Sequence, residues 1–211
     1  MKIDKLTATA CFPLSLAAWT VLATLAFAHT LAAQDTDWLR PVVPGEDKVT
    51  SLRVGDDAPA FSLRAYNEDI ALRLVKSPLV GLNFFVGIRP EYQKEVVLLA
   101  FLTAESQKDR HDLATLQKLY KKYKGNGVMV LAVSLDKEDP QTVYDALDRA
   151  NVTFPVLRDR FAVVARRYDV KQLPTLFVID KNGKIQSIGE NYSGDVEAYL
   201  DTKIRDLLAG I

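Results

Sequence analysis

The chain has 211 residues, of which 48% are hydrophobic and 26% are charged, and its formal net charge is zero. This is the composition of an ordinary soluble globular protein, with one domain plus extensions or two small domains. A neutral chain without a basic stripe has no electrostatic basis for binding nucleic acid, so we exclude nucleic acid as a partner.

The first 33 residues have the pattern of an export signal. Lys2 and Lys5 precede a stretch, Leu6–Gln34, that contains no Asp, Glu, Lys or Arg. Small residues follow its apolar part and predict cleavage after Ala28 or Ala33. The same stretch is also long enough to span a bilayer as an uncleaved anchor. Both alternatives place the folded part outside the cytoplasm, as a periplasmic or secreted protein, and the second adds membrane association through the N-terminal segment.

The cysteine count restricts the chemistry of the folded part. The only cysteine is Cys11, which lies inside the predicted signal segment. The mature chain is therefore expected to contain no thiol, no disulfide and no metal–thiolate site. His111 is interpreted as a solvated helix residue rather than a ligand. We expect no metal and no cofactor.

Residues 34–53 are polar and contain "RPVVPGED", which predicts a linker. From residue 54 to residue 211 the chain alternates strands and helices. Helical crossovers between the first strands favour parallel pairing, whereas the short turn near the end favours a hairpin. The first half of the domain is expected to contain extended pieces over Ala58–Leu63 and Ile70–Val75, a buried strand over Val96–Leu102, and a helix with Leu113, Leu116, Tyr120 and Tyr123 on its apolar face. A second buried strand is expected over Val128–Asp136, followed by a helix opened by Asp139 and Pro140, an extended piece over residues 154–159, and a helix from about Arg160 to Tyr168 that includes Phe161. A hairpin of residues 175–180 and 184–190 and a final helix capped by Ser193 complete the chain.

Several phrases of this domain, in this order, resemble a known fold. They are "VGDDAPAFSL", "VVLLAFLTAES", "LATLQKLYKKYKGNGVMVLAVSLD", "FPVLRDR" and "LPTLFVIDKNGKI". Together they resemble the redoxin group of the thioredoxin fold, which includes AhpC/TSA-type peroxiredoxins and TlpA/ResA-type extracytoplasmic disulfide reductases. The resemblance implies an α/β domain over residues 54–211, a thioredoxin-like three-layer α/β/α arrangement with a mixed central sheet.

The resemblance also implies where an active site would lie. In the reductases a strand runs into Cys-x-x-Cys at the start of the next helix. The flanking phrases then put Ser106 at the first cysteine position and Asp109 at the second, and Thr103 at the threonine of the peroxiredoxin word Thr-x-x-Cys. A rival register puts Arg89 and Tyr92 at the cysteine positions. Neither register contains a cysteine, so no catalytic residue is assigned.

Three features allow two interpretations each. Ser106 and Asp109 fit a helix capping box, which needs no catalytic role. Pro174 lies where the fold places a cis-proline facing the active site, whereas base rates favour trans. The insertion, residues 76–92, is either a loop with its own small apolar cluster or an edge that binds a partner.

Two classes of function remain. In the first, an exported redoxin-family protein without catalytic cysteines has a binding or accessory role. Its groove between Ser106 and Pro174 would take an unknown protein or an extended peptide. In the second, the chain is an enzyme of the oxidoreductase type, or a protein in which Ser106 stabilises the thiolate of a glutathione-type ligand.

Overall fold

The computed structural model describes residues 51–87, 89–104, 107–137, 139–190 and 196–210. They belong to one compact unit that extends from Lys48 to Ile211. The predicted signal segment, nearly all of the predicted linker and Ser193 lie outside the described residues. No helix among the described residues is long and apolar enough to cross a bilayer.

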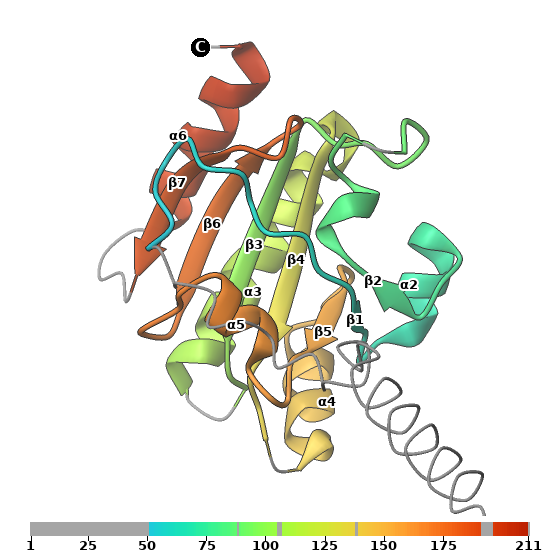
Figure 1. Ribbon diagram of the computed structural model, residues 1–211. Coiled ribbons are helices and arrows are strands. Elements are labelled where there is room, and N and C mark those ends of the chain that lie inside the picture. Colours follow the sequence, from blue (N-terminus) through green and yellow to red (C-terminus); the bar gives the residue numbers. More distant parts are fainter. Residues whose placement is uncertain (1–50, 88, 105–106, 138, 191–195, 211) are drawn as a thin grey trace, which may run out of the picture. The chain divides into compact units, whose positions relative to one another are not determined.

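The domain is built on a mixed five-stranded sheet with the strand order β5-β4-β3-β6-β7 (Figure 1). Strand β4 is parallel to β3 and to β5, while β6 is antiparallel to both β3 and β7. Every residue of β3 and of β4 is buried, as continuous apolar runs predict. The strands are β3 (Val96–Leu102), β4 (Val128–Ser134), β5 (Val156–Arg158), β6 (Thr175–Asp180) and β7 (Ile185–Glu190).

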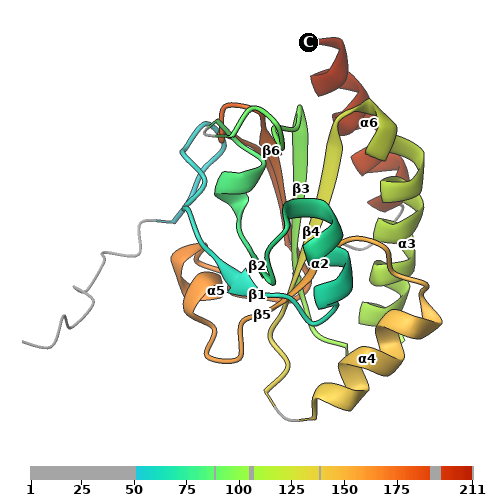
Figure 2. The same cartoon turned by 90° about the vertical axis from the view of Figure 1, so that its right-hand side faces the viewer.

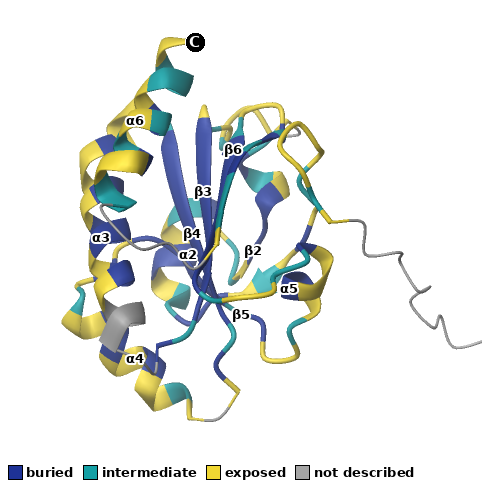
Figure 3. Ribbon diagram, turned by 90° about the vertical axis from the view of Figure 1, so that its left-hand side faces the viewer, coloured by how far each residue is buried: buried dark blue, intermediate teal, exposed yellow. Residues whose placement is uncertain are grey.

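Helices cover both faces of this sheet, so the domain has three layers (Figures 2 and 3). Helices α3 (Gln107–Tyr123) and α6 (Val196–Ala209) pack on one face, with α4 (Pro140–Arg149) on the same side. The short helix α5 (Val163–Arg167) and the described residues before β1 lie on the other. The four apolar positions predicted for α3 are all buried: Leu113, Leu116, Tyr120 and Tyr123. The predicted three-layer α/β/α class is therefore confirmed.

The start of α4 follows its local sequence. The carboxylate of Asp139 accepts a hydrogen bond from the backbone N–H of Gln141 at 2.9 Å, and Pro140 is the first helical residue. An acidic cap satisfies an N–H group that the helix leaves unpaired, and proline at this position needs no N–H. The prediction that Asp139 and Pro140 open a helix is confirmed.

The prediction of an extended piece over Ile70–Val75 was wrong. These residues belong to helix α2 (Glu68–Val75), in which Ile70, Ala71 and Val75 are buried. Their spacing matches one face of a helix, and the short apolar run obscured that period. The pair Arg73–Asp69, at i and i+4, adds a modest stabilisation on the exposed face. Of the other predicted extended piece, Ala58–Leu63, only Leu63 enters a strand.

The helix predicted from Arg160 to Tyr168 is shorter than expected. The buried carboxylate of Asp159 accepts hydrogen bonds from the backbone N–H groups of Val163, Val164 and Ala165, so α5 begins only at Val163. Phe161 was expected on the apolar face of this helix. It lies outside the helix instead, and 74% of its surface is exposed.

The insertion, residues 76–92, packs onto the domain. It contains strand β2 (Leu79–Val80), which pairs with β1 (Leu63–Arg64), and the 3-10 helix η2 (Leu82–Phe84). Val80, Leu82 and Phe85 are buried in the main core. This burial supports a loop packed onto the domain, although its apolar side chains join the main core and do not form a small cluster of their own.

Gly81 in this insertion has no room for a side chain. A Cβ atom there would lie 1.9 Å from the backbone oxygen of Phe61. We expect Gly81→Ala to lower the free energy of unfolding by about 1–3 kcal/mol, because the backbone must shift to relieve the clash. Urea denaturation measures this loss. Gly125→Ala is the matched control, since a Cβ there meets nothing within 4 Å. Equal midpoints for the two variants would show that the insertion is not packed as described.

Candidate functional site

The end of β3 and the start of β6 meet at one edge of the sheet. In the antiparallel pairing of these strands, Phe101 lies opposite Thr175. Pro174, the residue before Thr175, therefore lies beside Leu102. Helix α3 begins five residues after the end of β3, at Gln107. Pro174 and the start of α3 therefore both lie near the carboxyl end of β3. The carboxyl ends of strands are where α/β proteins commonly bind ligands.

The structure places the residues predicted for this site unevenly. Thr103 is half-buried, and Pro174 is buried beside the end of β3. The peptide bond between Leu173 and Pro174 is cis, as the resemblance implies. Asp109 lies in the first turn of α3, whereas Ser106 lies outside the described residues. The capping box of Ser106 and Asp109 stays a prediction.

The rival register has no support from the geometry. Arg89 and Tyr92 lie in the loop before β3, where the N–H of Tyr92 donates to the carbonyl of Arg89 at 3.0 Å. The guanidinium of Arg89 stacks 4.9 Å from the ring centre of Phe84, and the ring of Tyr92 packs against the same ring. These two positions form a turn, and they do not follow a strand at the start of a helix.

A buried carboxylate holds the turn after β3 in place. Asp136 is 6% exposed and its two carboxylate oxygens accept the backbone N–H of Ala104 at 3.1 and 3.0 Å. The hydroxyl of Ser134, at the end of β4, donates to the same carboxylate at 2.6 Å. The first residues of the turn are thereby tied to the neighbouring strand. Charge-assisted bonds of this kind are stronger than neutral ones.

Two further polar side chains complete this cluster. The ring of Tyr66 lies 5.7 Å from the guanidinium of Arg158, and its hydroxyl lies near Ser134. Burial raises the pKa of Tyr66, although the neighbouring Ser134 hydroxyl and the charge of Arg158 oppose that rise. The phenol therefore stays protonated at neutral pH. The Nε atom of Arg158 is buried and has no hydrogen-bond partner among the described residues.

Sequence reasoning missed this cluster as a site. The prediction treated Ser134 and Asp136 as the end of a buried strand and did not single out Tyr66 or Arg158. The available signal was the acid that directly follows a continuous apolar run, because a carboxylate next to a buried strand must be hydrogen-bonded. Its partner, Ala104, is 32 residues away in sequence.

The chemistry available at this edge is hydroxyl, carboxylate and guanidinium chemistry. The one cysteine of the chain, Cys11, lies outside the described residues. Among the described residues no group of three or more His, Cys, Asp or Glu side chains could hold a metal ion. His111 is exposed on α3, as predicted for a solvated helix residue.

The sheet order, the flanking helices and the cis-proline at the edge of β3 define the class: this is a thioredoxin-like α/β domain. Residues 54–188 match the family AhpC/TSA. The chain belongs to the AhpC/TSA family.

Relatives of known type agree with this assignment. The thiol-disulfide oxidoreductase ResA of Oceanobacillus iheyensis is 32% identical over 152 residues, which cover 71% of this chain and 72% of the relative. ResA of Geobacillus thermodenitrificans is 32% identical over 155 residues, which cover 72% of this chain and 79% of the relative. Among solved structures, a Chlorobium tepidum protein described as a candidate thiol:disulfide interchange protein DsbE is 27% identical, with a TM-score of 0.62, and the match covers 75% of this chain and 99% of that one.

Proposed function

We propose that this chain is a redoxin-family protein that binds an extended protein or peptide segment at the carboxyl edge of β3, without performing thiol–disulfide exchange. One observation carries the proposal: the whole chain has a single cysteine, Cys11, and it precedes the family domain. An internal disulfide needs two sulfur atoms, and a thiolate is the nucleophile in every exchange step. The hydroxyl of Ser106 supplies neither.

The proposed binding groove lies between Pro174 and the residues that join β3 to α3, among them Ser106. The carboxylate of Asp136, itself bonded by Ser134, accepts the N–H of Ala104 and so anchors the chain where it leaves β3. A preformed edge costs little ordering entropy when a ligand binds. An ordered site that lacks the cysteines for thiol–disulfide exchange therefore favours a role in ligand binding.

A second candidate function keeps a thiol but takes it from the ligand. The seventeen-residue helix α3 begins next to Ser106, and a helix N-terminus stabilises a nearby anion. A glutathione-type thiolate placed there would be stabilised by the helix and by the serine hydroxyl. Titration with reduced glutathione, followed by calorimetry, separates the two candidates, because the accessory role predicts no saturable binding.

The proposed role is tested by site-specific crosslinking in the native host. A photoreactive amino acid at position 106 is expected to give discrete protein adducts. The matched control carries the same group at Lys121, an exposed position near the other end of α3. Adducts of the same masses from both positions would contradict a binding edge beside Pro174.

We further propose that the protein is exported and that its domain works in the periplasm or medium, or on the membrane surface. The motivation is the uncharged stretch Leu6–Gln34 with its small-residue cleavage sites. Mass spectrometry of the native protein is expected to find the N-terminus at His29 or Gln34. Recovery of intact Met1 in the membrane fraction would instead establish the anchor, and intact Met1 in the cytosol would contradict export.

A further inference from the structure

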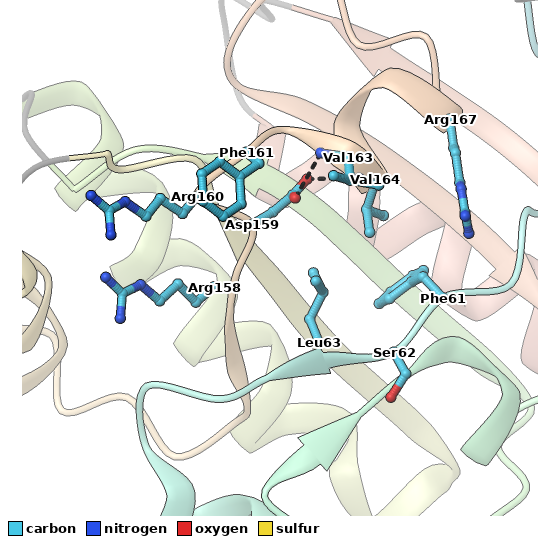
Figure 4. A pocket seen from close by; sticks show the side chains of 10 residues that line it. All are labelled: Phe61, Ser62, Leu63, Arg158, Asp159, Arg160, Phe161, Val163, Val164 and Arg167. Atoms are coloured by element: carbon cyan, nitrogen blue, oxygen red, sulfur yellow. Dashed lines mark hydrogen bonds between the residues drawn. The ribbon is translucent and has the colours of Figure 1, made fainter. Parts of the chain in front are cut away.

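A groove of about 510 Å³ lies between the segment Phe61–Leu63 and α5, and neither Thr103 nor Pro174 lines it (Figure 4). Its volume is within the roughly 300–1,000 Å³ of typical ligand sites. One wall is the consecutive run Phe61–Leu63, and the other is Arg158–Phe161 together with α5. Of the residues described above at the carboxyl end of β3 and in the cluster around Asp136, only Arg158 also lines this groove.

The groove carries unpaired positive charge. Three arginines line it, Arg158, Arg160 and Arg167. Among the ion pairs of the described residues, none joins any of these guanidinium groups to a carboxylate. The one acid in the lining, Asp159, already accepts three backbone N–H groups at the start of α5. The local charge is therefore positive in a chain whose net charge is zero.

The cations stand at opposite ends of the groove. Arg158 and Arg160 point to one side and Arg167 stands at the other (Figure 4). The space between them is apolar, because Phe61 and Leu63 project into it from one wall and Val164 from the other. A ligand that fits this arrangement has negative groups at two ends and an apolar group between them.

The wall formed by Phe61–Leu63 also offers unpaired backbone groups, at Ser62 just before strand β1. The N–H of Ala65 donates to Pro78 in the β1–β2 ladder, and in such a ladder alternate residues turn their backbone groups to the same side. Ser62 therefore turns its N–H and carbonyl away from β2. On that side the N–H of Tyr66 already bonds Val156 of β5. At Ser62 the segment Phe61–Leu63 has separated from the residues that follow β5. The backbone of Ser62 makes no hydrogen bond with the described residues.

We propose that this groove binds an extended acidic peptide, in which acidic and apolar residues alternate, as an added strand beside Phe61–Leu63. The peptide backbone pairs with Ser62, its apolar side chains pack between Phe61 and Val164, and its carboxylates bind Arg158 and Arg167. Strand addition supplies main-chain hydrogen bonds, and the arginines supply selection for acidic side chains.

The test uses the full natural chain and a fluorescein-labelled hexapeptide of alternating glutamate and valine. Fluorescence anisotropy is expected to show saturable binding that weakens as ionic strength rises. The same peptide with lysine in place of glutamate is expected not to bind. Equal binding of the lysine peptide overturns the proposal, and so does tighter binding of a single-stranded hexathymidylate, which would assign the groove to phosphates.

Charge-matched variants locate the site. The double variant R158Q/R167Q is expected to weaken binding roughly 5- to 30-fold, as the loss of two charge contacts implies. The control R149Q/R205Q removes the same charge from exposed positions on α4 and α6 and is expected to change binding less than about twofold. Equal effects of the two double variants overturn the proposal.

Amide hydrogen exchange tests the strand pairing in the unmodified chain. The glutamate peptide is expected to slow exchange at the N–H of Ser62 and to leave the N–H of exposed Lys121 unchanged. If the peptide binds and the exchange of Ser62 is unchanged, the strand-addition geometry is wrong. Binding is expected to be lost in Ser62→Pro but kept in Ser62→Ala, since only proline removes the donor, and equal binding of the two variants would show that the strand-addition geometry is wrong.

Discussion

Replacing Asp136 by alanine is expected to lower the free energy of unfolding by about 2–4 kcal/mol. The substitution leaves the N–H of Ala104, a residue only 1% exposed, without its acceptor. It also removes the acceptor for the hydroxyl proton of the buried Ser134. A buried polar group without a partner costs its full desolvation penalty, so two such groups add up to a large loss.

Urea denaturation of Asp136→Ala beside Asp139→Ala makes this comparison. Asp139 is exposed and caps α4 through a single bond to Gln141, so its loss is expected to cost about 0.5–2 kcal/mol. If Asp136→Ala loses no more stability than Asp139→Ala, the carboxylate does not hold the turn after β3.

The double variant Ser106→Cys with Asp109→Cys is expected to gain an internal disulfide that the natural chain cannot form. Two cysteines separated by two residues at a helix start can be bridged in this fold, and the helix N-terminus lowers the pKa of the first thiol below about 8.5. Among the sequence neighbours, the positive charge of Lys108 is expected to lower this pKa further, and the negative charge of Glu105 is expected to raise it. Alkylation followed by mass spectrometry detects the disulfide, and the pH dependence of alkylation gives the pKa.

The control for this graft is Arg89→Cys with Tyr92→Cys, in the loop before β3. Both pairs are made in a Cys11→Ser background, so that no third thiol interferes. A disulfide with a low thiol pKa at positions 89 and 92, together with two ordinary thiols at 106 and 109, would show that the assignment of the site to Ser106 and Asp109 is wrong.

The elements that sequence predicted well are those in which a single short-range rule decides. Strands β3 and β4 are continuous apolar runs, and no helix of that length would hide every side chain. Asp139 and Pro140 start a helix by local hydrogen bonding alone. The prediction for Ile70–Val75 was wrong because six residues contain too few turns to distinguish a helical period from that of a strand.

The candidate site was only partly accessible from the sequence. Pro174 and the turn before α3 came from resemblance to a family, and the pairing of Phe101 with Thr175 explains why they meet. The hydrogen bond from Ala104 to Asp136 and the contact of Arg158 with the ring of Tyr66 join residues far apart in the chain, so only the folded sheet brings them together. The same holds for Arg158 and Arg167, whose common groove depends on where α5 begins.

The central claim is that a redoxin scaffold is kept here without thiol chemistry, and reduction of insulin by dithiothreitol tests it most directly. The natural chain, purified from its host, is expected to leave the rate of insulin precipitation equal to that of dithiothreitol alone. The graft of two cysteines at 106 and 109 serves as the positive comparison. An acceleration by the natural chain that persists in a Cys11→Ser variant would contradict the account, because that protein contains no sulfur able to exchange.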